Sequence, residues 1–213
     1  MSAVDFADRR EQMVTLQLEA RGIRDPRVLA AMREIPRHQF VSEDQLELAY
    51  DDCALPIGEG QTVSQPYVVA WMLEALELCA SDRALEVGAG SGYAAAVLSR
   101  LARAVFAVER DPELVQAARG RLAALGVRNV ELASGDGSLG WPEHAPFDAI
   151  LVSAAAARVP PALVEQLAPG GRLVLPVRDE RGGQSLLRLR RKPDGALETR
   201  ELGPVQFVPL VPG

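Results

Sequence analysis

The residues of this chain best suited to chemistry form a glycine-rich segment, Glu86-Val87-Gly88-Ala89-Gly90-Ser91-Gly92, which follows an apolar run. Glycines let the backbone turn sharply and approach a ligand closely, and a glycine loop between a strand and a helix is typical of nucleotide binding. The spacing is Gly-x-Gly-x-Gly, whereas a dinucleotide site has Gly-x-Gly-x-x-Gly and a P-loop ends in Gly-Lys-Ser/Thr. The segment therefore indicates a nucleotide-like ligand and disfavours both of those sites.

Acidic residues at two later positions are suited to bind the same ligand as this loop. Glu109 lies roughly 20 residues further on, where a carboxylate can accept hydrogen bonds from both hydroxyls of a ribose. Asp136, in Gly135-Asp136-Gly137, follows the next apolar run and suits the edge of an adenine. A carboxylate at Glu86 suits a cationic ligand and would repel the phosphates of NAD. These three acids predict a site for S-adenosylmethionine, in preference to a plain strand–helix turn with a solvated Glu109.

The elements that must position these residues alternate between strands and helices. Strands are expected over residues 84–87, 104–108, 129–133, 148–152 and 172–176. Helices are expected between them, over residues 92–101, 111–125 and 160–167. Alternation at this spacing predicts an α/β fold with a doubly wound, mostly parallel sheet, Rossmann-like as in methyltransferases.

Residues before this core are expected to be mainly helical. A first helix, which Gly22 would end, carries apolar residues at helical spacing, namely Met13, Leu16 and Ala20. Asp25-Pro26 would open a short second helix. Residues 50–63 are interpreted as an irregular loop, and a further helix is expected over 65–78 with Ser64 as its N-cap.

Two antiparallel strands are expected after the core. Leu187 and Leu189 alternate with arginines, and residues 205–210 would form the second strand after a turn at Asp194-Gly195. The whole chain, 1–213, is then expected to be a single methyltransferase domain. Its parts would be a helical cap with the substrate loop (1–80), a cofactor-binding core (81–177) and C-terminal strands (178–213).

Composition excludes several classes of protein. The 213 residues are 48% hydrophobic and 24% charged, which suits one soluble globular domain. An excess of 29 acidic over 23 basic residues, a net charge of −6, argues against nucleic acid as a partner. Cys53 and Cys79 lack metal or redox spacing, and His38 and His144 are isolated, so no metal site is expected. Without a signal peptide or a run of roughly 18 apolar residues, a cytoplasmic protein that does not bind membranes is expected.

The residues after the fourth expected strand offer no base. Ser153-Ala154-Ala155-Ala156-Ala157 contains no Asp, Asn, His or Lys, and the Asn/Asp-Pro-Pro-aromatic run typical of DNA amino methyltransferases is missing. No Gly-x-Ser-x-Gly nucleophile elbow occurs either. A transferase of this kind needs a nucleophile already charged at pH 7, and a carboxylate, with a free pKa of about 4, meets that need. Catalysis would then consist of aligning carboxylate oxygen, methyl carbon and sulfonium sulfur away from water.

From Met13 to Pro212 the chain resembles the protein-L-isoaspartate O-methyltransferase family. The most specific segment is Gln61-Thr62-Val63-Ser64-Gln65-Pro66, which methyltransferases in general lack. The likeness continues over residues 49–50, 55–58, 135–141, 145–150, 167–173 and 207–210. Tyr67 stands where some members have His, and Gln206 replaces a common basic residue.

The resemblance implies methyl transfer from S-adenosylmethionine to the α-carboxylate of L-isoaspartyl residues in damaged proteins, with S-adenosylhomocysteine as the product. The ester then closes to a succinimide, which reopens in part as aspartate. Ser64 would be catalytic, beside both the methyl group and the acceptor carboxylate, a role compatible with capping the following helix. Cofactor contacts are expected from Thr62, Val63, Ser64, Tyr67, Glu86, Gly88, Gly90, Ser91, Gly92, Glu109, Arg110, Asp136, Gly137 and Gln184. Substrate contacts are expected from Ser64, Ile57, Val208 and Leu210.

Three alternatives stay open at this stage. A peptide-tailoring methyltransferase would esterify an ordinary aspartate to form an aspartimide. A protein that binds S-adenosylmethionine without catalysis would not need Ser64, and a nicotinamide oxidoreductase would bind NAD. The main interpretation is a monomeric repair enzyme acting on isoaspartyl proteins and peptides.

Overall fold

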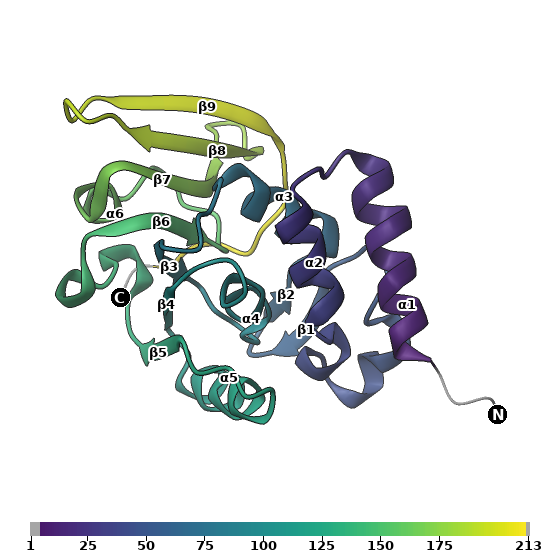
Figure 1. The fold of residues 1–213 in the computed structure, drawn as a ribbon. Helices are drawn as coiled ribbons and strands as arrows, with labels where there is room; N and C mark the ends of the chain where they lie inside the picture. Colours follow the sequence, from purple (N-terminus) through teal and green to yellow (C-terminus); the bar gives the residue numbers. More distant parts are fainter. Residues whose placement is uncertain (1–4, 212–213) are drawn as a thin grey trace.

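The computed structural model describes residues 5–211 and is built around a seven-stranded sheet in the order β5-β4-β3-β6-β7-β8-β9 (Figure 1). The strands are β3 (Arg83–Val87), β4 (Ala104–Glu109), β5 (Val130–Ser134), β6 (Phe147–Val152), β7 (Leu167–Arg178), β8 (Gln184–Arg191) and β9 (Leu197–Pro204). The first five are parallel, and β8 and β9 are antiparallel. The mostly parallel, Rossmann-like sheet with antiparallel C-terminal strands is therefore confirmed.

Helices cover both faces of this sheet because its central strands are apolar on both sides. Ala84 faces the helices α2 (Pro26–Glu34), α3 (Pro66–Ala75) and α4 (Tyr93–Leu98) in one core cluster. On the opposite face of β3, Leu85 and Val87 belong to a second cluster with Leu163 of α6 (Pro161–Glu165). Alternation along β3 therefore turns the side chain of Glu86 toward the α3 and α4 side.

The helix α5 (Pro112–Ala124) packs beside α4 and begins as its sequence predicts. Asp111 caps it by accepting hydrogen bonds from the amides of Glu113 and Leu114, and Pro112 takes the first helical position. Gly126 follows its last turn with a φ of 66°, a conformation that glycine adopts without strain.

The N-terminal segment forms a cap of helices beside the sheet (Figure 1). The helix α1 (Phe6–Gln12) runs into a π-helical turn, Met13–Leu18, and ends at Gly22, whose φ is 102°. The expected apolar face was wrong in two of its three positions, because Leu16 is 65% exposed and Ala20 is also exposed, whereas Met13 and Leu18 are buried. Hydrogen bonds from i to i+5 widen the π-helical turn, so residues five apart share a face.

Residues 50–63 are not wholly irregular, which corrects the predicted loop. They contain a hairpin of β1 (Leu55–Gly58) and β2 (Gln61–Val63). The two turn residues, Glu59 and Gly60, have φ values of 50° and 68°, as a two-residue type I′ turn requires.

Ser64 is not the N-cap of the following helix, contrary to prediction. The helix α3 begins at Pro66, which places Gln65 at the cap position with no side-chain capping bond. Proline lacks an amide hydrogen and is favoured at the first helical position, so it sets the start of the helix. Ser64 therefore precedes the helix with its hydroxyl uncommitted to capping.

The last strand is also displaced from its expected position. β9 is the polar, exposed segment Leu197–Pro204, whereas residues 205–210 leave the sheet and cross the carboxyl ends of its strands (Figure 1, yellow). We call residues 205–210 the strap. Ala155 holds it by donating its amide to Val208 and accepting the amide of Leu210, each at 2.8 Å. Val205 and Phe207 pack against one core cluster of the sheet, and Leu210 packs against the other.

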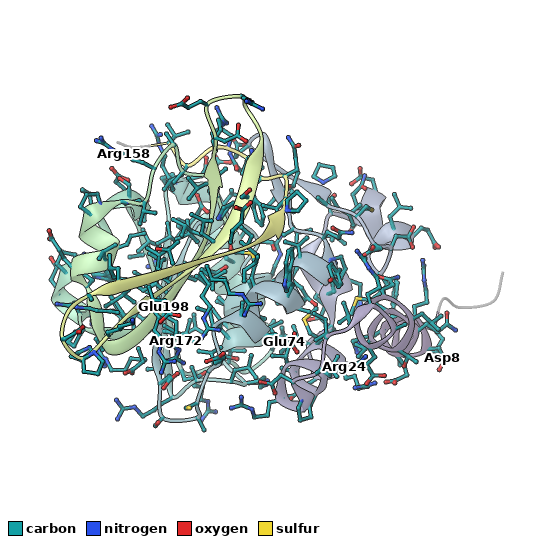
Figure 2. All side chains as sticks on the ribbon, turned by 90° about the horizontal axis from the view of Figure 1, so that it is seen from above. Asp8, Arg24, Glu74, Arg158, Arg172 and Glu198 are labelled. Carbon is teal, nitrogen blue, oxygen red and sulfur yellow. The ribbon has the colours of Figure 1, made fainter. Side chains whose placement is uncertain are left out.

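The amino ends of the strands are closed by a buried ion pair. Arg172 is labelled in Figure 2. Its guanidinium lies 2.7 Å from the Asp82 carboxylate and donates to the carbonyls of Leu76, Glu77 and Asp148. All of these partners lie where strands begin or where α3 ends. This end of the sheet is therefore filled by structural contacts, and the cavities beside the glycine loop lie at the opposite, carboxyl end.

No helix within residues 5–211 is long and apolar enough to cross a membrane. Cys53 and Cys79 are both free and exposed. In the same residues, no group of three or more His, Cys, Asp or Glu side chains is arranged to hold a metal ion.

Candidate active site

The glycine loop lies at the carboxyl ends of β3 and β4, beside the point where the strand order reverses between β3 and β6. Ligands of doubly wound sheets bind at this position. Gly88 and Gly90 have φ values of 81° and 52°, and the amide of Gly88 donates to the carbonyl of Val108 at 2.8 Å. A Cβ on Gly90 would lie 3.2 Å from Cδ1 of Ile57. The loop therefore needs glycine both for its conformation and for the close approach of the β1–β2 hairpin.

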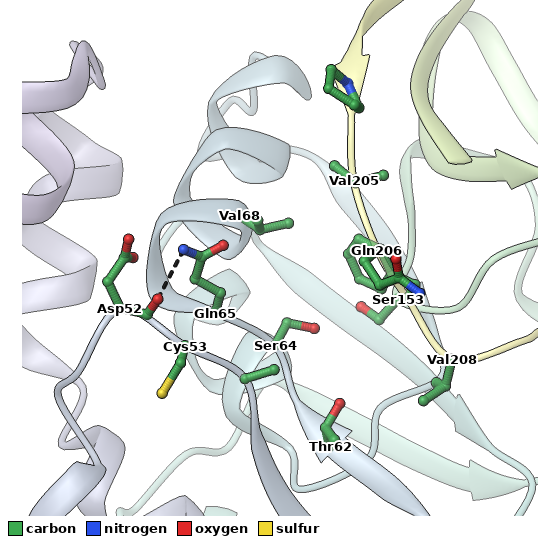
Figure 3. A pocket seen from close by; sticks show the side chains of 13 residues that line it. Asp52, Cys53, Thr62, Ser64, Gln65, Val68, Ser153, Val205, Gln206 and Val208 are labelled. Atoms are coloured by element: carbon green, nitrogen blue, oxygen red, sulfur yellow. Dashed lines mark hydrogen bonds between the residues drawn. The ribbon is translucent and has the colours of Figure 1, made fainter. Parts of the chain in front are cut away.

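Three neighbouring cavities open around this loop. The outer cavity, about 640 Å³, lies between the residues before α3 and the strap (Figure 3). The ribose-side cavity, about 90 Å³, runs past Glu109 to the strap, and the glycine-loop cavity, about 30 Å³, reaches Glu86. Thr62 and Ser153 line all three cavities. These two residues therefore mark the junction between the outer cavity and the two inner ones.

Two carboxylates dominate the electrostatics of the inner cavities. Glu86 is 1% exposed, and its Oε2 atom has no hydrogen-bond partner, while Oε1 accepts from the Ser153 hydroxyl at 3.5 Å. Burial raises the pKa of the Glu86 carboxyl well above its usual range, and the nearby Glu109 carboxylate raises it further. A buried carboxylate oxygen without a partner is costly, so this atom is a site for a positively charged donor.

Glu109 is held more firmly than Glu86. Its Oε2 atom accepts the amide of Gly90 at 2.8 Å, and its Oε1 atom accepts the amide of Asp111 at 3.1 Å. Each carboxylate oxygen has a second lone pair available for a ligand. Glu109 therefore connects the glycine loop to the start of α5 and still presents acceptors to the ribose-side cavity.

The outer cavity is built by the segment that leads into α3. Gln65 donates its side-chain amide to the carbonyl of Asp52 at 3.0 Å, which ties residues 52–54 to the start of the helix (Figure 3). Ser64 lines both the outer and the glycine-loop cavity. Among residues 5–211 no group is a hydrogen-bond partner of its hydroxyl. That hydroxyl is therefore available to a ligand placed between the cavities.

Most of the predicted site residues meet at these cavities. Those that line at least one of them are Thr62, Val63, Ser64, Glu86, Gly88, Gly90, Ser91, Glu109, Arg110, Gly137, Val208 and Leu210. They come from the hairpin, the glycine loop, the ends of β4 and β5, and the strap. The arrangement gathers acceptors for a cation and for hydroxyls on one side, and neutral donors on the other.

Four predicted contacts line none of these three cavities and have other partners in the structure. The Tyr67 ring is covered by the Arg21 guanidinium at 3.6 Å. A Cβ on Gly92 would lie 3.1 Å from that of Ala118, so this glycine lets α4 approach α5. Ile57 packs on the glycine loop, as described above. Asp136 accepts the amide of Ser138 at 2.8 Å and so holds the turn that presents Gly137.

Gln184, which is predicted to contact the cofactor, has its side-chain amide hydrogen-bonded to the strap. Its amide nitrogen donates to the carbonyl of Phe207 at 3.0 Å, and its amide oxygen accepts the Phe207 amide at 2.7 Å. Its own carbonyl accepts the amide of Val205 at 3.0 Å. Gln184 therefore continues the ladder of β8 with its side chain and fixes one end of the strap.

Sequence reasoning missed several lining residues of the outer cavity. They are Asp52, Cys53, Ala54, Gln65, Val68, Ser153, Pro204, Val205, Gln206 and Phe207. The only signal for Ser153 was its place directly after the strand 148–152, because strand ends carry the ligands of such sheets. The apolar strap gave a misleading signal, since its pattern also fits a strand.

Comparison with known proteins identifies the family to which this architecture belongs. The sequence profile of the family described as protein-L-isoaspartate(D-aspartate) O-methyltransferase matches residues 8–213. The chain belongs to this family. The resemblance predicted from the Gln61–Pro66 segment is therefore confirmed.

Individual relatives of the protein-L-isoaspartate O-methyltransferase family match nearly the whole chain. Protein-L-isoaspartate O-methyltransferase 2 of Pelobacter propionicus is 59% identical over 203 residues, which are 95% of this chain and 90% of that protein. The Methylorubrum extorquens protein-L-isoaspartate O-methyltransferase is 59% identical over 209 residues, covering 98% and 91%.

Solved structures of the family share the fold. A protein-L-isoaspartate O-methyltransferase matches with a TM-score of 0.86 and 31% identity, over 94% of this chain and 65% of that one. A Plasmodium falciparum protein assigned to the same activity, in complex with S-adenosyl-L-homocysteine, matches with a TM-score of 0.84 and 27% identity, over 95% and 98%.

Proposed function

We propose that this protein transfers a methyl group from S-adenosylmethionine to the α-carboxylate of L-isoaspartyl residues in damaged proteins. The observation that carries the proposal is the junction at Thr62, Ser64 and Ser153, where cavities rich in acceptors meet an outer cavity lined by neutral donors. The family match and the relatives at 59% identity support the same reaction. The ester that forms closes to a succinimide, which begins repair.

The inner cavities fit S-adenosylmethionine. The unpartnered, buried Oε2 atom of Glu86 suits the ammonium group of its methionine part, and Glu109 suits the ribose hydroxyls. Gly137 lies so close to β3 that a Cβ would meet Val87 at a separation below contact distance, so this residue lines the ribose-side cavity with its backbone alone. When bound, S-adenosylmethionine supplies a methyl group on a positively charged sulfur.

The outer cavity fits an acceptor that needs no base. Its lining contains no Lys, Arg or His, and its one carboxylate is Asp52. An isoaspartyl α-carboxylate is ionised at neutral pH. In the transfer, a bond forms between carboxylate oxygen and methyl carbon while the carbon–sulfur bond breaks and the sulfur keeps the electron pair. Because no proton moves, the residues of this site have only to bind and orient.

Ser64 is the proposed catalytic residue. Its hydroxyl, free of any capping role, lines both the outer and the glycine-loop cavity, where it can donate to the acceptor carboxylate. The start of α3, a helix of 10 residues, adds a partial positive charge that favours a bound anion. These local contributions offset the net charge of −6 carried by the whole chain.

The same proposal covers the remaining expectations. The partners are isoaspartyl proteins and peptides, and the protein acts as a monomeric, single-domain cytoplasmic enzyme that binds neither nucleic acid nor membranes. The shape of the outer cavity supports a peptide partner, since the strap gives it an extended backbone wall.

The proposal is tested with two peptides that differ only in an isoaspartyl or an aspartyl residue. With labelled S-adenosylmethionine, we expect a base-labile methyl ester on the isoaspartyl peptide alone. Cofactor binding without methylation of either peptide would refute it and favour a non-catalytic binding protein. Methylation confined to the aspartyl peptide would refute it in favour of aspartimide formation.

A further inference from the structure

Ser153 occupies the position where the three cavities meet, yet no predicted role covers it. It is the first residue after β6, and its amide donates to the carbonyl of Val87 at 2.8 Å, which fixes its backbone against the end of β3. Its side chain is half-buried and lines the outer, ribose-side and glycine-loop cavities. A hydroxyl is thus held in place beside the reacting centre.

The hydroxyl of Ser153 is only weakly engaged. Within residues 5–211 it makes one hydrogen bond, to Oε1 of Glu86, and that bond is 3.5 Å long. A hydroxyl bound well to a carboxylate lies about 2.5–2.7 Å away. The Ser153 hydroxyl can therefore turn to another acceptor at little cost.

Ser153 and Ser64 face the same space from opposite walls. Ser64 comes from the segment before α3, Ser153 comes from the end of β6, and in Figure 3 their hydroxyls point toward one another. Both residues also line the glycine-loop cavity. A group placed between them is within reach of two neutral donors.

A carboxylate in this cavity needs such donors. Its lining offers no cation, and Asp52 adds a negative charge. One hydroxyl can satisfy one carboxylate oxygen and leave the second unbound, at a cost in desolvation. Neutral donors also orient the carboxylate without pairing its charge with a cation, which preserves the charge that the attack requires.

We propose that Ser153 is a second substrate-binding residue, whose hydroxyl donates to one oxygen of the acceptor carboxylate while Ser64 donates to the other. This inference rests on the proposed function, since it assigns a further residue to the same acceptor. The end of β6, which offers no base, then contributes a hydroxyl that binds the acceptor. The competing role for Ser153 is to orient Glu86 toward the cofactor.

The test compares Ser153→Ala with Ser153→Thr, which keeps a hydroxyl, and with Ser81→Ala. Ser81 is an exposed serine in the turn before β3, at the amino ends of the strands, and serves as the matched control. For each variant we measure KM and kcat for an isoaspartyl peptide at saturating S-adenosylmethionine, and the Kd of S-adenosylhomocysteine by calorimetry. Thermal unfolding confirms that each variant is folded.

We expect Ser153→Ala to raise the peptide KM roughly tenfold or more, the loss typical of a hydrogen bond to a charged group. Its Kd for S-adenosylhomocysteine should stay within about twofold of wild type. Ser153→Thr should recover most of the KM, and Ser81→Ala should behave as wild type in every measurement.

An unchanged peptide KM in a folded Ser153→Ala variant overturns the proposal. A weaker Kd for S-adenosylhomocysteine with an unchanged peptide KM also overturns the proposal. Ser153 would then orient Glu86 toward the cofactor and would not bind the acceptor. If the wild-type protein itself methylates no isoaspartyl peptide, the proposed function fails, and the assignment of Ser153 fails with it.

Discussion

Replacing Glu86 by Gln removes a buried charge while keeping the size of the side chain. In the protein without ligand, Oε2 of Glu86 has no partner, and burial together with Glu109 raises the pKa of the carboxyl. An ionised carboxylate that is buried without a partner costs free energy that a neutral amide of the same size avoids, about 1–3 kcal/mol once the pH exceeds the raised pKa. We therefore expect Glu86→Gln to stabilise the ligand-free protein by about 1–3 kcal/mol, which raises Tm by roughly 2–12 °C for a chain of this size.

The stabilisation should depend on pH in a defined direction. Because folded Glu86 keeps its proton to higher pH than the unfolded chain does, the folded state binds more protons. The free energy of unfolding of the wild type then falls as pH rises from the usual glutamate range through the raised pKa. The Tm advantage of Glu86→Gln should be absent below the usual glutamate pKa and grow as the pH increases.

Binding of the cofactor should change in the opposite sense. Losing one hydrogen bond between a carboxylate and an ammonium costs about 1.5–3 kcal/mol, which weakens Kd roughly 10- to 150-fold. S-adenosylmethionine and S-adenosylhomocysteine share the ammonium, so calorimetry should show a similar loss for both. The control is Glu143→Gln, which removes an exposed carboxylate remote from the cavities. A variant that binds both ligands as tightly as wild type would refute the role given to Glu86.

Three further changes, together with one control, test the site and its supports. Ser64→Ala should lower kcat/KM for an isoaspartyl peptide roughly 10- to 100-fold, by loss of a hydrogen bond to the acceptor, with little change in Tm. Gln184→Leu should raise the peptide KM severalfold and leave the Kd of S-adenosylhomocysteine nearly unchanged, because it frees only the Val205 and Phe207 end of the strap; equal losses in both would contradict this. Gly137→Ala should destabilise the fold by about 1–3 kcal/mol, since its Cβ would overlap Val87. Gly120→Ala, in open space on α5, should instead be neutral or stabilise by up to about 1 kcal/mol, as seen in thermal unfolding.

The parts of the fold that sequence predicts well are those decided by neighbouring residues. Asp111 and Pro112 start α5 through a cap and a fixed φ, which act within a few residues. The glycine loop likewise follows from local backbone needs, and Glu109 follows from the end of the adjacent strand. Because parallel strands present their carboxyl ends at one edge, these local predictions are sufficient to bring the predicted cofactor residues together.

The parts that sequence reasoning missed depend on contacts between distant segments. Gln184 and Phe207 are 23 residues apart, and nothing local shows that an amide side chain will replace a strand partner. The strap has the apolar pattern of a strand, but Ala155 draws it across the sheet. The predicted cap at Ser64 is wrong because Pro66 is favoured at the first helical position, which places the cap one residue later, at Gln65.

The measurement that tests the central claim most directly is the location of the methyl group after one incubation. An isoaspartyl peptide is treated with the protein and S-adenosylmethionine, and fragment masses are followed with time. We predict a methyl ester on the α-carboxylate of the isoaspartyl residue, followed by succinimide and then by the normal aspartyl peptide. A methyl group on any other carboxylate or on an amine, or equal labelling of the aspartyl peptide, would contradict the account.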